Sequence, residues 1–336
     1  MQIDPTFTFH YCDMPATYPA MPFFIILNAA SGHREAGDTR AIISRVMREA
    51  GKKHHLMLVE NPGDLAEIAR SAVAKANQVG GAVVVAGGDG TINTVANAVL
   101  ASACPLGVLP SGTFNYFGRT HGIPEDTEDA VRMLLAASPQ PVQVGLVNDR
   151  LFLVNASLGL YPKLLEDREA WKAQYGRSRL VALWAGLVSV ARARRQLRLQ
   201  LAKDGEVAHW RTPTLFVGNN KLQLQQIGMA EADALDAGFL AAISPHPVGT
   251  LALLWLALRG ALGTLGDARH VRSFALRELE VSRSARRSRT IKVAVDGEVL
   301  QLQEPLRFRV SPQPLYLLKT GTQTGTQTGT QTGSAA

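Results

Sequence analysis

The residues best suited to chemistry in this chain form a glycine-rich segment, Gly87-Gly88-Asp89-Gly90-Thr91, which follows an apolar, β-branched run. Three glycines in four positions let a ligand approach the main chain without meeting a Cβ atom. A helix that begins there presents free N–H groups and the positive end of its dipole. The segment is therefore suited to cradling phosphate groups. Because its spacing matches neither GxxxxGK[ST] nor GxGxxG, an ordinary P-loop and a dinucleotide fingerprint are excluded at this position.

Asp89 is the acidic residue within this cradle, where its carboxylate would repel bare phosphate. The residue makes chemical sense if it handles a divalent cation or the proton of a hydroxyl group. We therefore expect a metal-bound phosphate ligand here. The alternative is a glycine-rich strand-to-helix turn that binds no ligand.

Two further loops of small polar residues follow expected strands. They are Asn28-Ala29-Ala30-Ser31-Gly32 and Pro110-Ser111-Gly112-Thr113-Phe114-Asn115. In a doubly wound sheet the carboxyl ends of neighbouring strands converge on one crevice, so the three loops together predict a composite nucleotide site. Taken singly, Asn28 and Asn115 are more typical of turn capping than of ligand contact.

The elements that must position these loops alternate along residues 22–141. Short β-branched runs at 23–28, 54–60, 82–87 and 105–110 alternate with helical patterns at 39–51, 64–78, 91–101 and 125–137. This alternation predicts an α/β domain with a doubly wound parallel sheet. Beyond Val142 strand-like stretches dominate, with helices only within 162–196 and near 247–262, which predicts a mostly β, sandwich-like domain with inserted helices.

The chain is thus divided into four parts. Residues 1–21 are interpreted as a loose leader, 22–141 as the nucleotide-binding domain, 142–318 as a β-rich lipid-acceptor domain, and 319–336 as a disordered low-complexity tail. The tail repeats Thr-Gly-Thr-Gln and holds almost nothing apolar to bury.

Composition excludes several classes of protein. The chain has 336 residues, 46% of them hydrophobic, which suits a soluble globular protein larger than a single small module. Its two cysteines, Cys12 and Cys104, lie far apart and match no disulfide framework or zinc site. The N-terminus lacks the pattern of a secretory signal, and the longest apolar stretch, 248–258, is well short of the ~20 residues that span a bilayer. We expect a cytoplasmic protein.

The formal net charge of +7 is concentrated in two clusters. Residues 161–200 hold nine Lys or Arg against three acidic residues, and 272–292 hold seven against two. The segment 177–195 places apolar side chains on one helical face with arginines at both ends, so it suits an anionic membrane surface. A solvated, domain-packing helix is the alternative. We expect peripheral membrane association, no nucleic-acid partner, and consider a homodimer.

Taken together, the motifs resemble the diacylglycerol kinase catalytic-domain superfamily, specifically its bacterial lipid kinase branch. The resemblance is carried by NAASG at 28–32, GGDGT at 87–91, PSGTFN at 110–115, FVGNN at 216–220 with LDAGFL at 235–240, and VDGE at 295–298. GGDGT alone is also similar to NAD kinases and phosphofructokinases. The GTFN and VDGE segments favour the lipid kinases.

The resemblance implies an α/β nucleotide domain, a β-sandwich domain and an active site between them. It implies Mg²⁺-dependent transfer of phosphate from ATP to a lipid hydroxyl, with diacylglycerol the default acceptor. Glu298 matches the family's proton acceptor, and Asp89 matches the catalytic residue associated with Mg²⁺ and ATP. On its own, Asp296-Gly297-Glu298 predicts a hairpin turn. The residues that the resemblance assigns to ATP are Ser31, Gly87, Gly88, Asp89, Gly90, Thr91, Ile92, Asn93 and Thr113.

Three positions depart from the family pattern. Tyr116 replaces the Asp that follows GTxN, Ala237 replaces the Asp of a turn that holds a structural cation in some relatives, and Val59-Glu60 stands where relatives often have a Thr near the nucleotide. Whatever the family's Asp at the position of Tyr116 contributes to ordering the metal or the nucleotide must therefore be absent here or supplied by another residue. A soluble NAD kinase-like transferase and a non-catalytic nucleotide or lipid sensor of the same fold remain as alternatives.

Overall fold

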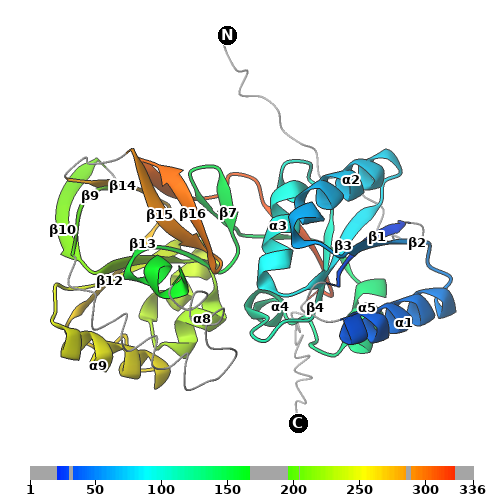
Figure 1. Ribbon diagram of the computed structural model, residues 1–336, viewed down its shortest axis with the longest axis horizontal. Helices are drawn as coiled ribbons and strands as arrows, with labels where there is room; N and C mark the ends of the chain where they lie inside the picture. The colour runs from blue at the N-terminus through cyan, green and yellow to red at the C-terminus, as the bar shows by residue number, and fades with distance from the viewer. Residues whose placement is uncertain (1–20, 30–32, 167–195, 204, 285–288, 322–336) are drawn as a thin grey trace, which may run out of the picture.

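The computed structural model describes residues 21–29, 33–166, 196–203, 205–284 and 289–321. Two units lie side by side, with the N-terminal elements in one and most of the C-terminal strands in the other (Figure 1). The leader, residues 1–20, the tail from 322 and the basic segment 177–195 lie outside the described residues, as does Ser31.

The first domain is a doubly wound α/β fold, as the sequence predicts. Its sheet has the order β2-β1-β3-β4-β18-β5, and β2, β1, β3 and β4 are parallel. The strands are β1 (Phe23–Asn28), β2 (His54–Val59), β3 (Ala82–Gly87), β4 (Leu106–Pro110), β5 (Ser138–Val142) and β18 (Leu315–Lys319). The helices are α1 (His33–Glu49), η2 (Pro62–Asp64), α2 (Leu65–Gln78), α3 (Asp89–Leu100), α4 (Tyr116–Thr120) and α5 (Thr127–Leu135).

The hydrophobic pattern of the central strands explains this layering. Every residue of β3 (AVVVAG) is buried, as expected for a strand covered on both faces. Helices α1 and α5 pack together on one face, and α2 packs with α3 on the other. The order of the strands reverses direction between β1 and β3. This is the topological switch point, at which doubly wound sheets bind ligands.

Strand β18 differs from the expectation that residues 142–318 form the second domain. It returns from the second domain and pairs with β4 in parallel and with β5 in antiparallel fashion. Its alternating pattern LYLLK buries Leu315, Leu317 and Leu318 in the first core. The expected tail therefore begins later than residue 319, which is the last residue of β18.

The second domain consists of two six-stranded antiparallel sheets. One sheet has the order β10-β9-β14-β17-β6-β7 and the other β13-β12-β11-β8-β15-β16. The first sheet contains β6 (Gly145–Val147), β7 (Arg150–Phe152), β9 (Leu197–Lys203), β10 (Glu206–Thr212), β14 (Glu278–Arg283) and β17 (Leu306–Val310). The second contains β8 (Asn155–Gly159), β11 (Thr214–Gly218), β12 (Leu240–Pro245), β13 (Val271–Leu276), β15 (Thr290–Val295) and β16 (Glu298–Gln303).

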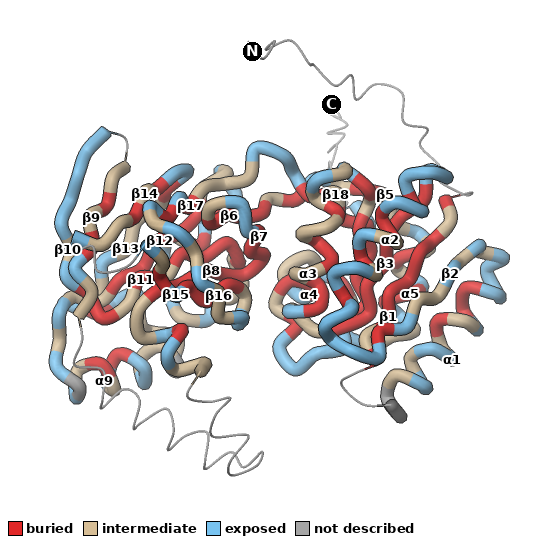
Figure 2. Tube along the Cα trace, turned by 45° about the horizontal axis from the view of Figure 1, so that its top comes forward, coloured by how far each residue is buried: buried red, intermediate tan, exposed pale blue. Residues whose placement is uncertain are grey.

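Buried side chains from both sheets form one shared core, which defines a sandwich. Leu199 and Phe308 come from one sheet, and Leu158 and Val293 from the other. The buried interior of each domain is coloured red in Figure 2. Helix α8 (Lys221–Gln226), η3 (Ala230–Ala237) and α9 (Thr250–Ala261) are inserted between strands. Within the described residues, no helix has both the length and the apolar character to cross a bilayer.

Candidate active site

Three loops meet at the carboxyl edge of the first sheet because β1, β3 and β4 are adjacent and parallel. The Asn28 side chain at the end of β1 donates to the Thr91 hydroxyl in the first turn of α3, at 2.8 Å. The amide of Ser111 after β4 donates to the carbonyl of Gly87, at 3.1 Å. The convergence predicted from the sequence is therefore present, and hydrogen bonds hold the loops together.

Asp89 links the glycine loop to the loop after β4. Its two carboxylate oxygens accept from the amides of Tyr116 and Phe117, at 3.2 Å each. These amides open helix α4, where a carboxylate also interacts favourably with the helix dipole. Asp89 thus caps α4, a structural role that the sequence analysis did not anticipate. Each oxygen accepts one protein hydrogen bond and retains a lone pair for another partner.

Two of the glycines are required by the close packing of these loops. A Cβ atom on Gly112 would lie 2.9 Å from the Cα of Gly88, and one on Gly87 would lie 2.7 Å from the Cβ of Thr91. Gly90 is different, because a Cβ atom there meets nothing within 4 Å. The open space at the N-terminus of α3 is therefore at Gly90, where a phosphate could approach the helix.

Asn115 shapes the loop after β4 as a turn residue. Its backbone is left-handed, with φ of 48°, and its side chain accepts from the amide of Gly112 and donates to the Gly112 carbonyl. This agrees with the turn-capping role that is typical of asparagine. Thr113 at the tip of the loop is exposed.

The second turn of α3 is bonded to the second domain through Asp296. One Asp296 oxygen accepts from the Asn93 side chain and the Leu153 amide, both at 2.7 Å. The other accepts from the amides of Val154 and Asn155, at 2.9 and 2.8 Å. Burial raises the pKa of the Asp296 carboxyl above its usual value, and these hydrogen bonds oppose the shift.

Neighbouring polar groups extend this network along α3. Asn93 also donates to the Leu151 carbonyl, while Asn97 accepts from the Leu151 amide and donates to the side chain of Asn93. Asn93, which the resemblance assigned to ATP, therefore bonds the two domains in this structure. The turn that contains Asp296 and Gly297 has left-handed φ angles of 45° and 90°, and it leads directly to Glu298.

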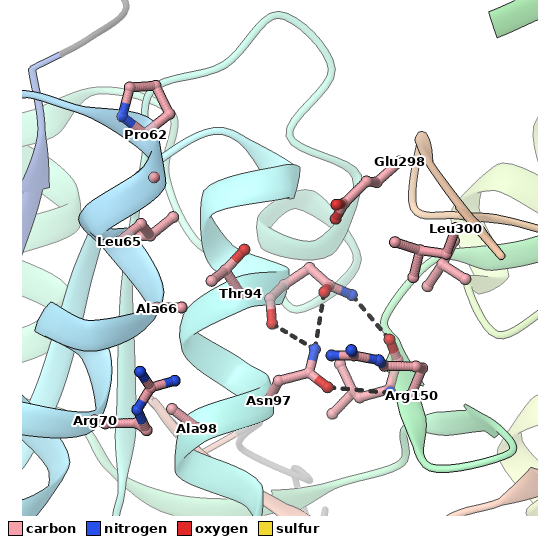
Figure 3. Close-up of a pocket in the computed structure, with 14 residues that line it drawn as sticks. Pro62, Leu65, Ala66, Arg70, Thr94, Asn97, Ala98, Arg150, Glu298 and Leu300 are labelled. Carbon is pink, nitrogen blue, oxygen red and sulfur yellow. Dashed lines mark hydrogen bonds between the residues drawn. The ribbon is translucent and has the colours of Figure 1, made fainter. Parts of the chain in front are cut away.

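Glu298 lies at a cavity of about 460 Å³ that both domains line. The first domain contributes residues of α2 and α3, and the second contributes the start of β7 and the β15–β16 hairpin. In Figure 3 the Glu298 carboxylate points from its hairpin toward α3, the helix that carries Thr94. Arg70 and Arg150 lie at another side of the same cavity.

The glycine loop itself is not among the residues that line this cavity. Asn93 and Thr94 line it, one turn along the helix that begins at Asp89. Thr91 and Ile92 are buried, so their side chains belong to the core that holds the loop rather than to an open surface. The structure thus brings Glu298 to α3 and leaves Gly90 exposed at the start of the same helix.

The FVGNN segment also bonds the domains together. Asn219 is buried and donates to the carbonyls of Leu153 and Gln143. Asn220 donates to the carbonyl of Tyr116 at 3.1 Å, while its own oxygen caps α8. Tyr116, at the position of the family's Asp, stacks on the exposed ring of Phe114 with 5.8 Å between centroids.

A second interdomain cavity, of about 430 Å³, lies beside α4 and is lined by His121, Arg119, Lys221 and Lys319 among others. Burial lowers the pKa of His121 to about 4, and the positive charge of Lys319 contributes to the shift. Lys221 forms ion pairs with Asp236 at 2.5 Å and Asp233 at 3.4 Å.

Metal binding cannot rest on a ready-made protein cluster in the part of the chain that the structure describes, because no group of three or more His, Cys, Asp or Glu side chains gathers there. Asp89 is the carboxylate that the sequence predicts for a cation. A hard cation such as Mg²⁺ commonly binds one or two carboxylates together with the phosphates of its nucleotide, and the free lone pairs of Asp89 are compatible with that mode.

Asp296 and Asn97 were not predicted from the sequence as residues that form the site. The Asp-Gly pair did signal a hairpin turn, which is what β15 and β16 form. The Asp-Gly pair did not indicate that the Asp296 carboxylate accepts four hydrogen bonds. Their donors lie in segments about 140 and 203 residues away in the sequence.

The chain is similar in sequence to a family of lipid kinases. Residues 22–147 match the family described as the diacylglycerol kinase catalytic domain. A relative from Enterobacter sp. named "Probable lipid kinase YegS-like" is 30% identical over 214 residues, covering 60% of this chain and 66% of the relative. One from Salmonella gallinarum, "Probable lipid kinase YegS", is 31% identical over 211 residues with the same shares. The match therefore spans slightly less than two thirds of these relatives.

A solved structure from Bacillus anthracis, described as a "putative diacylglycerol kinase", shares the fold. It superposes with a TM-score of 0.67 at 19% sequence identity and covers 89% of this chain and 97% of that chain. The structural similarity extends over both domains, and at this sequence identity it shows a shared fold only.

Proposed function

We propose that the chain is a lipid kinase that transfers the γ-phosphate of ATP to a lipid hydroxyl, on the basis of the match of residues 22–147 to the diacylglycerol kinase catalytic domain and the similarity to probable lipid kinases. We propose a diacylglycerol-like lipid alcohol as the acceptor. The observation that carries the proposal is that Glu298 points into a cavity lined by α3, the helix that begins in the glycine loop.

The nucleotide would bind at the N-terminus of α3. The exposed Gly90 leaves room for phosphate beside the free N–H groups of the first turn, and Asp89 has lone pairs to share with a cation. Bound Mg²⁺ would neutralise the charge that develops on the phosphates. Hydrogen bonds from Asn28 and from the loop after β4 keep this segment in place, which limits reorganisation during the reaction.

Glu298 would accept the proton of the lipid hydroxyl. An alcohol has a very high pKa, so its proton must leave as the oxygen bonds to phosphorus, and a positioned carboxylate can take it. The bond that breaks joins the γ-phosphorus to the bridging oxygen of ADP. Because Glu298 belongs to the second domain and the cradle to the first, the reaction requires the fixed domain arrangement that Asp296 and Asn93 bond together.

The two alternatives from the sequence predict different products. A soluble NAD kinase-like enzyme would phosphorylate a nucleotide, and a sensor would bind its ligand without turnover. The Glu298 cavity is consistent with an enzyme, because a carboxylate directed at α3 could accept the proton of an acceptor hydroxyl; turnover distinguishes this from a sensor, in which the same carboxylate would only accept a hydrogen bond.

We propose that the protein acts in the cytoplasm at the membrane surface, where a lipid acceptor is found. The basic cluster in residues 161–200, most of it outside the described residues, suits an anionic leaflet.

The experiment that tests the function uses purified protein with γ-labelled ATP and Mg²⁺. The protein is assayed separately with three kinds of candidate acceptor: dispersed dioctanoylglycerol, phospholipids with a free hydroxyl group in mixed micelles, and NAD. Label in a lipid product supports the proposal. Label in NADP, or no turnover with any lipid at saturating ATP, would refute it.

A further inference from the structure

We propose that the outward face of helix α9 is a membrane-docking surface. This docking face consists of Leu251, Trp255, Leu258 and Leu262, and its occupant is the surface of an anionic lipid bilayer. The inference rests on the proposed function in one respect: a lipid kinase must reach an acceptor that resides in a membrane.

The docking face is a continuous apolar stripe. Its four residues are spaced by four, three and four positions, which places them on one side of an α-helix. Their exposed fractions are 84% for Leu251, 58% for Trp255, 48% for Leu258 and 67% for Leu262. Three large apolar side chains on one short helix and a fourth at its C-cap, Leu262, exceed the scattered exposed residues that are normal for a protein surface.

The opposite face of α9 packs against the second domain. Leu253 and Leu256 are buried, with exposed fractions of 8% and 7%. They line an apolar cavity of about 300 Å³ between α9 and the sheet that contains β11 and β12. The inner side of the helix therefore packs against the second domain, and the docking face is left exposed to solvent.

The charge around α9 complements an anionic leaflet. Residues 238–266 contain no Asp or Glu, and the Asp267 that follows forms an ion pair with Arg259 of α9 at 3.8 Å. Exposed Arg269 and Arg272 come next, so basic residues outnumber acidic ones around the helix. The amide of His246, four residues before α9, bonds the carbonyl of His270, which brings this basic edge to the start of the helix. Apolar side chains flanked by cations are the pattern of a helix that lies in a membrane interface, and an indole such as Trp255 is favoured there.

Vesicle flotation tests the docking face with a matched control. The test variant is Leu251→Glu/Leu262→Glu, and the control is Val79→Glu/Val207→Glu, which adds the same charge at two other exposed apolar positions of 57% and 55%. Vesicles contain phosphatidylcholine and phosphatidylglycerol in equal parts. Each buried leucine contributes enough free energy that losing both should weaken partitioning by at least about tenfold. The control should bind within about twofold of wild type.

Vesicle binding, oligomeric state and thermal stability together decide the result. Equal binding by the test variant and wild type, or no binding by wild type, would overturn the proposal. So would a wild-type dimer in analytical ultracentrifugation that the test variant loses, because the face would then belong to a second copy. A lower thermal midpoint for the test variant than for the control would assign the face to another segment of this chain.

Turnover of dispersed dioctanoylglycerol separates this proposal from the proposed function. Unchanged turnover in the test variant together with lost vesicle binding supports docking. Docking that depends on α9 in a protein with no lipid kinase activity would leave the docking face established and the proposed function refuted.

Discussion

Replacing Asp296 by Asn should uncouple the two domains. One carboxylate oxygen accepts from Asn93 and the Leu153 amide, and the other accepts from the amides of Val154 and Asn155. An asparagine has one acceptor oxygen and one NH₂ group, so it can serve one of these pairs. The other pair would then face a donor in place of an acceptor.

The size of the effect follows from the two donors that lose their partner. A buried donor left unsatisfied costs about 1–3 kcal/mol, so the pair costs roughly 2–6 kcal/mol. Because part of the residue is exposed although its carboxylate is enclosed by four donors, water can compensate in part, and we expect about 2–3 kcal/mol of lost unfolding free energy. Asp38→Asn, an exposed carboxylate on α1, is the matched control and should change stability by less than about 0.5 kcal/mol.

Urea unfolding measures the stability change, and hydrogen exchange measures its location. In Asp296→Asn the amides of residues 153–155 should exchange faster than in Asp38→Asn, while amides within β3 stay protected. Turnover should fall more than ATP affinity, since the cradle is intact and Glu298 is misplaced. Unchanged stability with unchanged exchange at 153–155 would refute the role assigned to Asp296.

The remaining predictions concern the nucleotide loop and the second cavity. Gly90→Ala, with open space for its Cβ, should leave the fold intact or stabilise it by up to about 1 kcal/mol, yet weaken ATP binding in calorimetry; wild-type affinity would place the phosphates elsewhere. Gly88→Val should weaken ATP binding, because a Cβ atom there already touches the Cα of Gly112 at 3.4 Å and the two γ-methyl groups of Val extend beyond it into the space between the loops; wild-type ATP affinity would place the phosphates elsewhere. Asp89→Asn should lower turnover by on the order of 10²-fold and stability by about 1 kcal/mol through the weakened cap of α4, and full activity would remove Asp89 from the site. His121 has a lowered pKa in the folded state, so unfolded chains bind its proton more readily; the unfolding free energy should fall as pH decreases from about 6.5 towards 4, by up to roughly 3 kcal/mol, and a His121→Gln variant with the same pH slope would contradict this.

Much of the fold could be predicted because its signals are local. The strand ending at Gly87 is a short β-branched run, and the helix after it begins at a glycine turn, so both elements follow from neighbouring residues. The meeting of the loops after β1, β3 and β4 also followed, since it is a property of parallel sheets.

The rest could not be predicted because it depends on pairs of residues far apart in the chain. Strand β18 has an ordinary strand pattern, and nothing local indicates that it joins β4 rather than the sandwich. The sequence around Asp89 indicates a ligand-binding residue in a glycine-rich loop. That its carboxylate also caps α4 becomes visible only when α4 is placed beside it. The partners of Asp296 likewise appear only once the domains are placed against each other.

Single-turnover kinetics of Glu298→Gln test whether Glu298 accepts the proton of a lipid hydroxyl next to ATP bound at α3. Glu278→Gln, which changes an exposed carboxylate on β14, is the control. With γ-labelled ATP and dispersed dioctanoylglycerol, the proposed role of Glu298 predicts that Glu298→Gln loses about 10²- to 10⁴-fold in the rate of phosphoryl transfer while its ATP affinity and unfolding free energy match those of Glu278→Gln. A Glu298→Gln protein that transfers phosphate at the rate of the control would contradict it, and the proton acceptor would then have to be sought in the first domain, with Asp89 as the leading candidate.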